Sequence, residues 1–150
     1  AFPELKRWDF RILATDIDSN VVGKAARGIY PSTELNGLSA QRAALFEKVE
    51  TGEIRIPRAA HELVTFKLLN LIEAWPVSGP FDAIFCRNVA IYFDKPTQGM
   101  LFDRLGQVLA PDGFLYIGHS ENLQAVSKGF KLVGKTVYQR KANADAKDAA

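Results

Sequence analysis

The chain has 150 residues, of which 47% are apolar and 24% charged, and its formal net charge is +2 at pH 7. This length suits a single domain with a sizeable core. The nearly balanced charge, without a dense basic stripe, gives no support for nucleic-acid binding, and no apolar run approaches the roughly 20 residues that span a bilayer. The single cysteine, Cys86, excludes an internal disulfide and fits a reducing, cytoplasmic setting.

The first third of the chain predicts one strand and two helices. Residues 10–15 form a short apolar strand. The helix after it has Asp18 or Ser19 as its cap and Gly28 just beyond its end. A second helix is expected over residues 39–48.

The middle third predicts two more strands. Gly52 lies in a turn between two short segments, which fits a small β-excursion. Residues 63–69 predict a strand, and a loop over residues 76–80 follows it. Residues 81–86 are a nearly continuous apolar run, which is typical of a strand buried on both faces.

The last third predicts a helix, a strand and a hairpin. Asp94-Lys95-Pro96 is a strong helix start, and apolar residues recur with helical spacing from Leu101 onward. Residues 114–117 form another apolar strand, and residues 130–139 a hairpin linked by Gly134-Lys135. The whole order predicts an α/β fold with a parallel, doubly wound sheet that a terminal antiparallel hairpin completes.

Polar residues gather where the apolar strands stop, and ligands bind at the carboxyl ends of strands in an open α/β sheet. Asp16, the first of these residues, can accept both hydroxyls of a ribose through its two carboxylate oxygens. The alternative is that Asp16 caps the next helix. We assign the cap to Asp18 or Ser19 and the ligand role to Asp16.

Four further residues follow later strands. Asn70 and Leu71 pair an amide with an apolar wall, which suits the edge of an adenine, although an ordinary strand-end asparagine explains Asn70 equally well. Arg87 and Asn88 follow the next strand, and Tyr92 shares a face with Asn88 if this stretch is helical. Taken alone, the last three fit a surface arginine, a turn asparagine and a core tyrosine better.

Two other chemistries find little support. His119, Ser120 and Glu121 are consecutive, whereas the members of a hydrolytic triad converge from separate elements. Two histidines 58 positions apart and one cysteine make no metal-ligand pattern. His61 is expected on the surface of a helix or loop.

Four blocks of sequence carry a family resemblance. They are ILATDIDSNVVGKAARGIY, FKLLNLIEAWPVSGPFDAIFCRNVAIYFDK, APDGFLYIGHSENL and FKLVGKTVYQRK. In order and spacing they resemble the CheR family of chemotaxis receptor methyltransferases over most of residues 11–141. The segment FDAIFCRNVAIYFDK is the most specific part of the match.

The resemblance implies a Rossmann-like class I methyltransferase that uses S-adenosyl-L-methionine, with S-adenosyl-L-homocysteine as product. The implied reaction methylates glutamate side chains in the cytoplasmic domain of chemoreceptors, without nucleic acid and without direct membrane insertion. Tyr92 would face the reacting centre as the catalytic residue. The implied cofactor-binding residues are Asp16 for the ribose, Asn70 and Leu71 for the adenine, and Arg87 and Asn88 for the methionine and ribose side.

The residues present agree with methyl transfer to a carboxylate. A glutamate side chain, with an ordinary pKa of about 4.3, is already an anion at neutral pH and needs no strong base. The sulfonium supplies the reactivity, so alignment and exclusion of water fall to the protein. A site poor in histidine and cysteine fits those tasks.

Two departures from the family pattern bear on function. Residues 1–150 begin with Ala1-Phe2-Pro3 and lack the family's small N-terminal domain, its Gly-rich cofactor loop and the first strand, which the family places between the strands ending at Asp16 and Cys86. Residues 1–141 are therefore interpreted as a partial methyltransferase domain, poorly stable and weak in cofactor binding by itself, with a disordered tail over residues 142–150.

The second departure concerns the inserted β-subdomain, about residues 45–62. It is shorter than in relatives that dock a receptor's C-terminal tail peptide, so we expect independence from such a peptide. Two other functions are kept as alternatives. One is a non-catalytic regulatory or protein-interaction module on the same fold, and the other is a methyltransferase for a small molecule or RNA.

Overall fold

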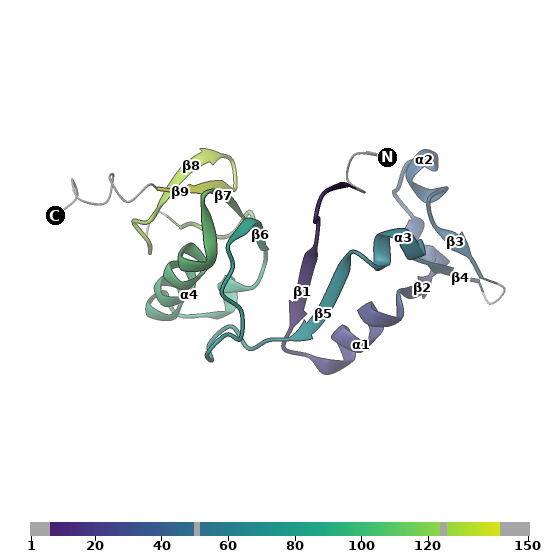
Figure 1. Cartoon of the computed structure of the whole chain (residues 1–150), viewed down its shortest axis with the longest axis horizontal. Helices are drawn as coiled ribbons and strands as arrows, with labels where there is room; N and C mark the ends of the chain where they lie inside the picture. Colours follow the sequence, from purple (N-terminus) through teal and green to yellow (C-terminus); the bar gives the residue numbers. More distant parts are fainter. Residues whose placement is uncertain (1–6, 50–51, 124–125, 142–150) are drawn as a thin grey trace. The chain divides into compact units, whose positions relative to one another are not determined.

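The computed structural model describes residues 7–49, 52–123 and 126–141, and the chain divides into two compact units, Ala1–Asn70 and Leu71–Ala150 (Figure 1). Each unit contains its own sheet or sheets. The mixed α/β class predicted from the sequence is confirmed. The predicted tail, residues 142–150, lies outside the described residues.

The first unit is built on one parallel strand pair. Strand β1 (Ile12–Asp16) pairs with β5 (Val64–Leu68) in a register that sets Ile12 opposite Val64 and Asp16 opposite Leu68. Helix α1 (Ser19–Arg27) packs on both strands, as a crossover helix does in a parallel sheet. Both strands agree with the sequence prediction, although β1 begins two residues later than expected.

Both ends of α1 are set by the residues that the sequence indicated. The Asp18 side chain is the cap, because its Oδ1 accepts the N–H of Asn20 at 2.7 Å. Gly28 ends the helix in a left-handed conformation with a φ of 65°. A Cβ at Gly28 would lie 2.8 Å from the ring of His61, whose centre lies 5.4 Å from that of the Phe66 ring, with the two rings tilted by 35°. His61 lies at the end of a short helix and is half-buried, with its ring beside Gly28.

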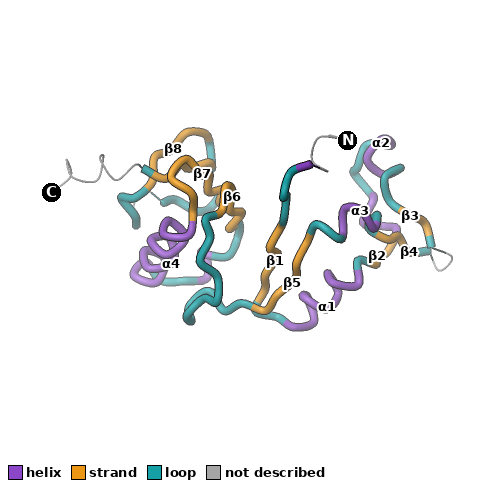
Figure 2. Tube along the Cα trace, viewed as in Figure 1, coloured by secondary structure: helices purple, strands orange, loops and turns teal. Residues whose placement is uncertain are grey.

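A small antiparallel sheet forms the rest of the first unit (Figure 2). Its strand order is β2-β4-β3, with β2 (Ile29–Pro31), β3 (Glu47–Lys48) and β4 (Glu53–Arg55). Two of these strands lie in the segment interpreted as a β-subdomain, about residues 45–62, and β2 precedes it. The short helices beside it are η2 (Ser32–Leu35), α2 (Ala40–Ala43) and α3 (Arg58–His61).

The predicted helix over residues 39–48 is wrong in length. Ser39 is its cap, as expected, but α2 ends at Ala43. Glu47 and Lys48 instead pair with β4, whose Ile54 is only 2% exposed. Burial of Ile54 and the strand ladder outweigh the weak helical preference of this segment, because propensity is easily overridden by tertiary contacts.

The second unit contains a four-stranded mixed sheet in the order β6-β7-β9-β8. Strand β6 (Phe81–Cys86) runs parallel to β7 (Leu109–Ile117), and the hairpin of β8 (Phe130–Gly134) and β9 (Val137–Arg140) is antiparallel. The hairpin is confirmed, but its turn is at residues 135–136, one position later than predicted.

Helix α4 (Lys95–Val108) covers the sheet of the second unit (Figure 1). Its Asp94 cap accepts the N–H of Thr97 at 2.9 Å, and its apolar side packs against β7, so the helix predicted from Asp94-Lys95-Pro96 is confirmed. A short turn, η3 (Ala90–Tyr92), precedes it. The buried cluster comprises Cys86, Ala90, Leu101, Phe102, Leu105, Leu109, Leu115, Ile117, Leu123, Phe130 and Tyr138.

Strand β6 is not buried on both faces, which corrects the sequence prediction. Phe85 is 70% exposed and is covered only in part, by a 4.4 Å stack on Tyr116. Among the described residues β6 pairs with β7 alone, and β1 pairs with β5 alone. In the described part of the chain, each of these two strands therefore has a strand partner along one edge only.

Replacement Leu101→Ala should lower the free energy of unfolding of the second unit by about 2–5 kcal/mol, because Leu101 is fully buried. Met100→Ala, at a neighbouring position on the same helix that is 41% exposed, is the matched control and should cost less than about 1 kcal/mol. Urea unfolding followed by the emission of Trp75, which packs on the core, measures both. Equal losses in the two variants would contradict this description of the core.

Candidate functional site

Asp16 and Asp18 divide two tasks at the carboxyl end of β1. Asp18 caps α1, and Asp16 does not. The Oδ1 atom of Asp16 accepts the N–H of Asp18 at 2.9 Å, which closes a small turn. The other oxygen, Oδ2, takes no part in this turn. The predicted separation of cap and ligand candidate is therefore compatible with the local geometry.

Asn70 lies near Asp16 in the topology of the first unit. The carbonyl of Asp16 accepts the N–H of Leu69 at 3.0 Å, so β1 and β5 end at the same level. Asn70 follows at once and is half-buried. The sequence prediction that Asp16 and Asn70 lie at the carboxyl ends of neighbouring parallel strands is correct.

Leu71 opens the second unit and is held by two residues that sequence reasoning missed. Its carbonyl accepts hydrogen bonds from Trp75 Nε1 at 3.2 Å and from Arg104 Nη1 at 3.3 Å. Arg104 also donates to the carbonyl of Glu73 at 2.6 Å, and its guanidinium lies 5.3 Å from the Trp75 ring centre. Arg104 therefore fixes the backbone that follows Leu71 from a position on α4.

Arg87 and Asn88 follow β6 on an exposed loop. Asn88 has a φ of 58°, in the left-handed region, so residues 88–92 are not a continuous helix. The condition under which Asn88 and Tyr92 would share a helical face is therefore not met. Tyr92 is 81% exposed, which also removes the interpretation as a core tyrosine.

The carboxylate of Glu121 binds this loop, and sequence reasoning missed it. Its Oε1 accepts the N–H of Val89 at 3.2 Å and of Ala90 at 2.9 Å. Its Oε2 accepts the N–H of Asn88 at 3.2 Å and also the N–H of Gly118. The available signal was a carboxylate three residues after a glycine at the end of a strand that neighbours β6.

Gly118 permits the close approach of these two loops. A Cβ at this position would lie 2.5 Å from Asn88 Oδ1, 2.7 Å from Glu121 Oε2 and 3.0 Å from the Asn88 backbone nitrogen. Any larger residue must therefore displace both the side chain of Asn88 and the carboxylate of Glu121. Glycine at this strand end is a packing requirement.

Cys86 ends β6 directly before Arg87, but its thiol is not a nucleophile. Burial and, to a smaller extent, the negative charge of Glu121 raise the pKa of Cys86 to about 11. The thiol is therefore protonated at neutral pH, and it packs in the core cluster. Covalent catalysis by this cysteine is excluded on these grounds.

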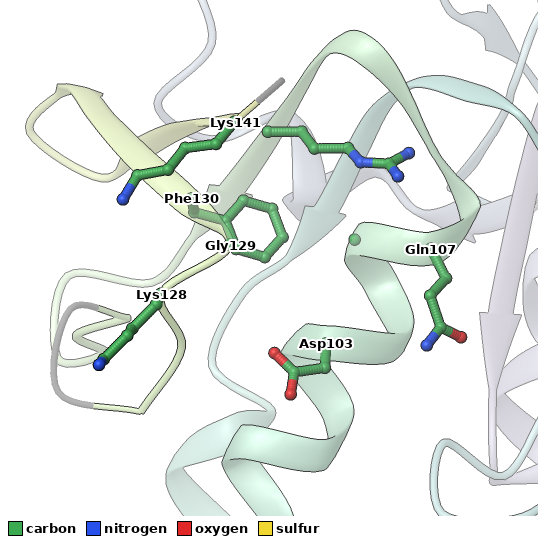
Figure 3. Close-up of a pocket in the computed structure, with 8 residues that line it drawn as sticks. Asp103, Gln107, Lys128, Gly129, Phe130 and Lys141 are labelled. Carbon is green, nitrogen blue, oxygen red and sulfur yellow. The ribbon is translucent and has the colours of Figure 1, made fainter. Parts of the chain in front are cut away.

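Two cavities lie elsewhere. A hollow of about 190 Å³ lies beside α4 and the strands β8 and β9, with Asp103 and Gln107 on the helix and Lys128, Phe130 and Lys141 across from them (Figure 3). Another, of about 330 Å³, is lined by Arg27, Glu47, Arg55, Ile56, Arg58 and His61. Neither contains a residue predicted for the site, and the first is smaller than typical small-molecule pockets.

Over the part of the chain that the structure describes, no group of three or more His, Cys, Asp or Glu side chains is arranged to hold a metal ion. In the same residues, no helix has the length and apolar character to cross a bilayer. The candidate site therefore consists of strand-end residues and the backbone amides beside them.

The left-handed conformation of Asn88 gives a stability prediction. Asn88→Gly should be more stable than Asn88→Ala by about 1 kcal/mol, because alanine is strained at a φ of 58°. This reverses the usual preference for alanine over glycine. Urea unfolding of the two variants measures the difference, and a more stable alanine variant would show that the loop does not hold this conformation.

Comparisons with known proteins identify the family to which this chain is similar. The family described as CheR methyltransferase, SAM binding domain, matches residues 1–139. The chain is 43% identical over 133 residues to chemotaxis protein methyltransferase 2 of Pseudomonas aeruginosa, covering 85% of this chain and 48% of that protein. It is 44% identical over 137 residues to the chemotaxis protein methyltransferase of Salmonella typhimurium, covering 88% and 47%.

A similar relation holds for the chemotaxis protein methyltransferase of Escherichia coli, which is 43% identical over 137 residues and covered to 47%. The chain thus spans about half the length of the curated relatives it matches. The family's description names S-adenosylmethionine as its ligand. With most of its length matched, the chain belongs to the CheR methyltransferase family, in the S-adenosylmethionine-binding domain.

Proposed function

We propose that this chain provides cofactor-binding and catalytic residues of a protein-glutamate O-methyltransferase that acts on the cytoplasmic domain of chemoreceptors. The family and the names of the relatives support methyl transfer in chemotaxis. The observation that carries the proposal is Asp16, a strand-end carboxylate that does not cap α1. Its position is the one at which parallel α/β sheets bind nucleotide-like ligands.

The residues of the first unit fit the nucleoside part of S-adenosyl-L-methionine. A ribose presents two adjacent hydroxyl donors, and the Oδ2 atom of Asp16 is not used in the turn with Asp18. The turn itself holds the carboxylate in one orientation, which lowers the ordering entropy that binding must overcome. Asn70, at the same strand end, offers an amide donor and acceptor for the adenine edge.

The residues of the second unit fit the adenine and the methionine part of the cofactor. Leu71 offers an apolar wall for the adenine, on a backbone fixed by Arg104. Arg87 is exposed, and its positive charge suits the carboxylate of the methionine part. Asn88 adds an amide on a loop whose backbone is already ordered.

Tyr92 is the residue that we assign to the reacting centre. The cofactor supplies an electrophilic methyl group on a sulfonium, so the chain needs no strong base and no thiol nucleophile. The hydroxyl of Tyr92 would donate to one oxygen of the substrate glutamate and leave the other free to form the O–CH₃ bond as the C–S bond breaks. A methyl ester and S-adenosyl-L-homocysteine result.

The same proposal implies where in the cell the enzyme works and which part of the receptor it contacts. Methylation of a receptor's cytoplasmic domain requires a cytoplasmic enzyme. Independence from a receptor tail peptide is supported by the short β-subdomain, in which β3 has two residues and β4 three. An edge this short offers few backbone groups for adding a peptide strand.

Asp16→Asn should weaken binding of S-adenosyl-L-homocysteine by about tenfold or more, because the asparagine keeps the turn to Asp18 but loses one charged acceptor. Asp18→Asn is the matched control, since asparagine caps helices as well as aspartate does. It should change the affinity by less than about twofold. Calorimetry on the whole natural protein measures both, and equal affinities for wild type and Asp16→Asn would remove the ribose assignment.

Transfer to a carboxylate predicts an alkali-labile product. Receptor cytoplasmic domain labelled from methyl-tritiated S-adenosyl-L-methionine should release its label as methanol at alkaline pH. Label that resists alkali would indicate N-methylation and would contradict glutamate side chains as the substrate.

Tyr92→Phe should lower kcat by about tenfold to a hundredfold with little change in cofactor affinity, because it removes one orienting hydrogen bond.

A further inference from the structure

We propose that Glu121 is a positioning residue for the cofactor site, which holds the loop after β6 so that the side chain of Asn88 is presented in one orientation. The inference rests on the proposed function, because it concerns the same site. Glu121 itself does not touch the cofactor in this proposal. It acts through the backbone of residues 88–90 and through Gly118.

The first argument is the saturation of the carboxylate. Both oxygens of Glu121 accept backbone N–H groups, and these come from the ends of two neighbouring parallel strands, β6 and β7. The two ion pairs found among the described residues, Arg11–Asp9 and Arg58–Glu62, do not include it. Its negative charge is therefore stabilised by aligned amide dipoles, which makes charge-assisted hydrogen bonds of the stronger kind.

The second argument is the conformation that these hydrogen bonds impose. Three successive N–H groups, from Asn88 to Ala90, point to one anion, and Asn88 is left-handed. Alternating left- and right-handed residues turn consecutive amides inward in this way, as in an anion-binding nest. The carboxylate thus stabilises a backbone conformation that a non-glycine residue adopts only at some expense in free energy.

The third argument is the place of the Asn88 side chain. Its Oδ1 lies over Gly118, where a Cβ would come within 2.5 Å. The loop backbone is fixed from one side by Glu121, and the side chain of Asn88 rests on the glycine that Glu121 also holds. Without the carboxylate, Asn88 would sample several conformations, and binding would have to order it.

A purely structural role for Glu121 predicts something different. In that case its loss would lower stability and weaken every function to a similar degree. The positioning role predicts that the loss is transmitted through Asn88 and is specific to the cofactor. Coupling between the two residues separates these explanations, because distant independent sites have additive effects.

The test uses the whole natural protein and S-adenosyl-L-homocysteine as the probe in calorimetry. Glu121→Gln should weaken binding by about tenfold. Both carboxylate oxygens of Glu121 accept backbone N–H groups, whereas the glutamine amide is neutral and has only one oxygen that can accept them. Adding Glu121→Gln to Asn88→Gly should weaken binding of S-adenosyl-L-homocysteine by less than about a further twofold, because the two residues are coupled. Adding it to Asp16→Asn should instead multiply the two losses of affinity, because those residues act independently. Glu62→Gln, which removes an exposed carboxylate paired with Arg58, is the control and should bind like wild type.

Steady-state kinetics provide the second measurement. The KM for S-adenosyl-L-methionine should rise about tenfold in Glu121→Gln while the KM for the receptor stays unchanged. If Glu121→Gln does not fold, as judged by circular dichroism, Gly118→Ala replaces it. The added Cβ pushes Asn88 Oδ1 and Glu121 Oε2 apart, while the charge of Glu121 is retained. Gly118→Ala should give the same selective rise.

The outcomes distinguish the two proposals. Wild-type protein that binds no S-adenosyl-L-homocysteine overturns the proposed function and the role of Glu121 with it. Wild-type binding together with unchanged affinity in a folded Glu121→Gln overturns the positioning role alone. Full multiplication of the Glu121→Gln and Asn88→Gly effects, or equal rises in both KM values, also overturns it in favour of a purely structural carboxylate.

Discussion

The parallel pairing of β6 with β7 is the constraint on which the second unit depends. It sets Cys86 opposite Ile117, so the two strands end at the same level. The loop after each strand then starts within reach of the other, and Glu121 can bind amides from both. Helix α4 keeps the pair together from one face, by packing its buried residues on β7 and by holding the segment after Leu71 through Arg104. The core of the second unit and the loop that Glu121 binds are therefore consequences of one strand register.

The sequence predicted the parts of the fold that local chemistry decides. Asp18, Gly28 and Asp94 cap their helices where the pattern placed them, because short side-chain and backbone hydrogen bonds decide helix ends. The helix over residues 39–48 failed, because its last two residues pair with β4, a strand that comes later in the chain. The burial of β6 failed for a related reason. An apolar segment shows that a strand favours burial. It does not identify which neighbouring elements would cover a given side chain, such as Phe85.

The candidate site divides in the same way. Residues at strand ends, such as Asp16 and Asn70, could be found because the topology assigns ligands to that edge. The roles of Glu121 and Arg104 could not be predicted, because they depend on backbone atoms more than thirty residues away in the chain. Asn88 lies between these cases. Its position was predicted, but its left-handed conformation excludes the helical relation to Tyr92 that the spacing suggested. A hydrogen bond to a distant main-chain amide leaves no periodicity in the sequence.

The open edge of β6 also bears on how the chain behaves at high concentration. A strand with free N–H and C=O groups along one side is a template for another strand, and proteins commonly protect such edges with charge, proline or bulges. On β6 the only charged residue is Asp82, near its start, and the apolar surface around Phe85 is unprotected. Edge-to-edge addition of copies is therefore the association that this edge favours wherever it is left uncovered. A further strand paired along β6 would cover its free backbone groups and prevent this association.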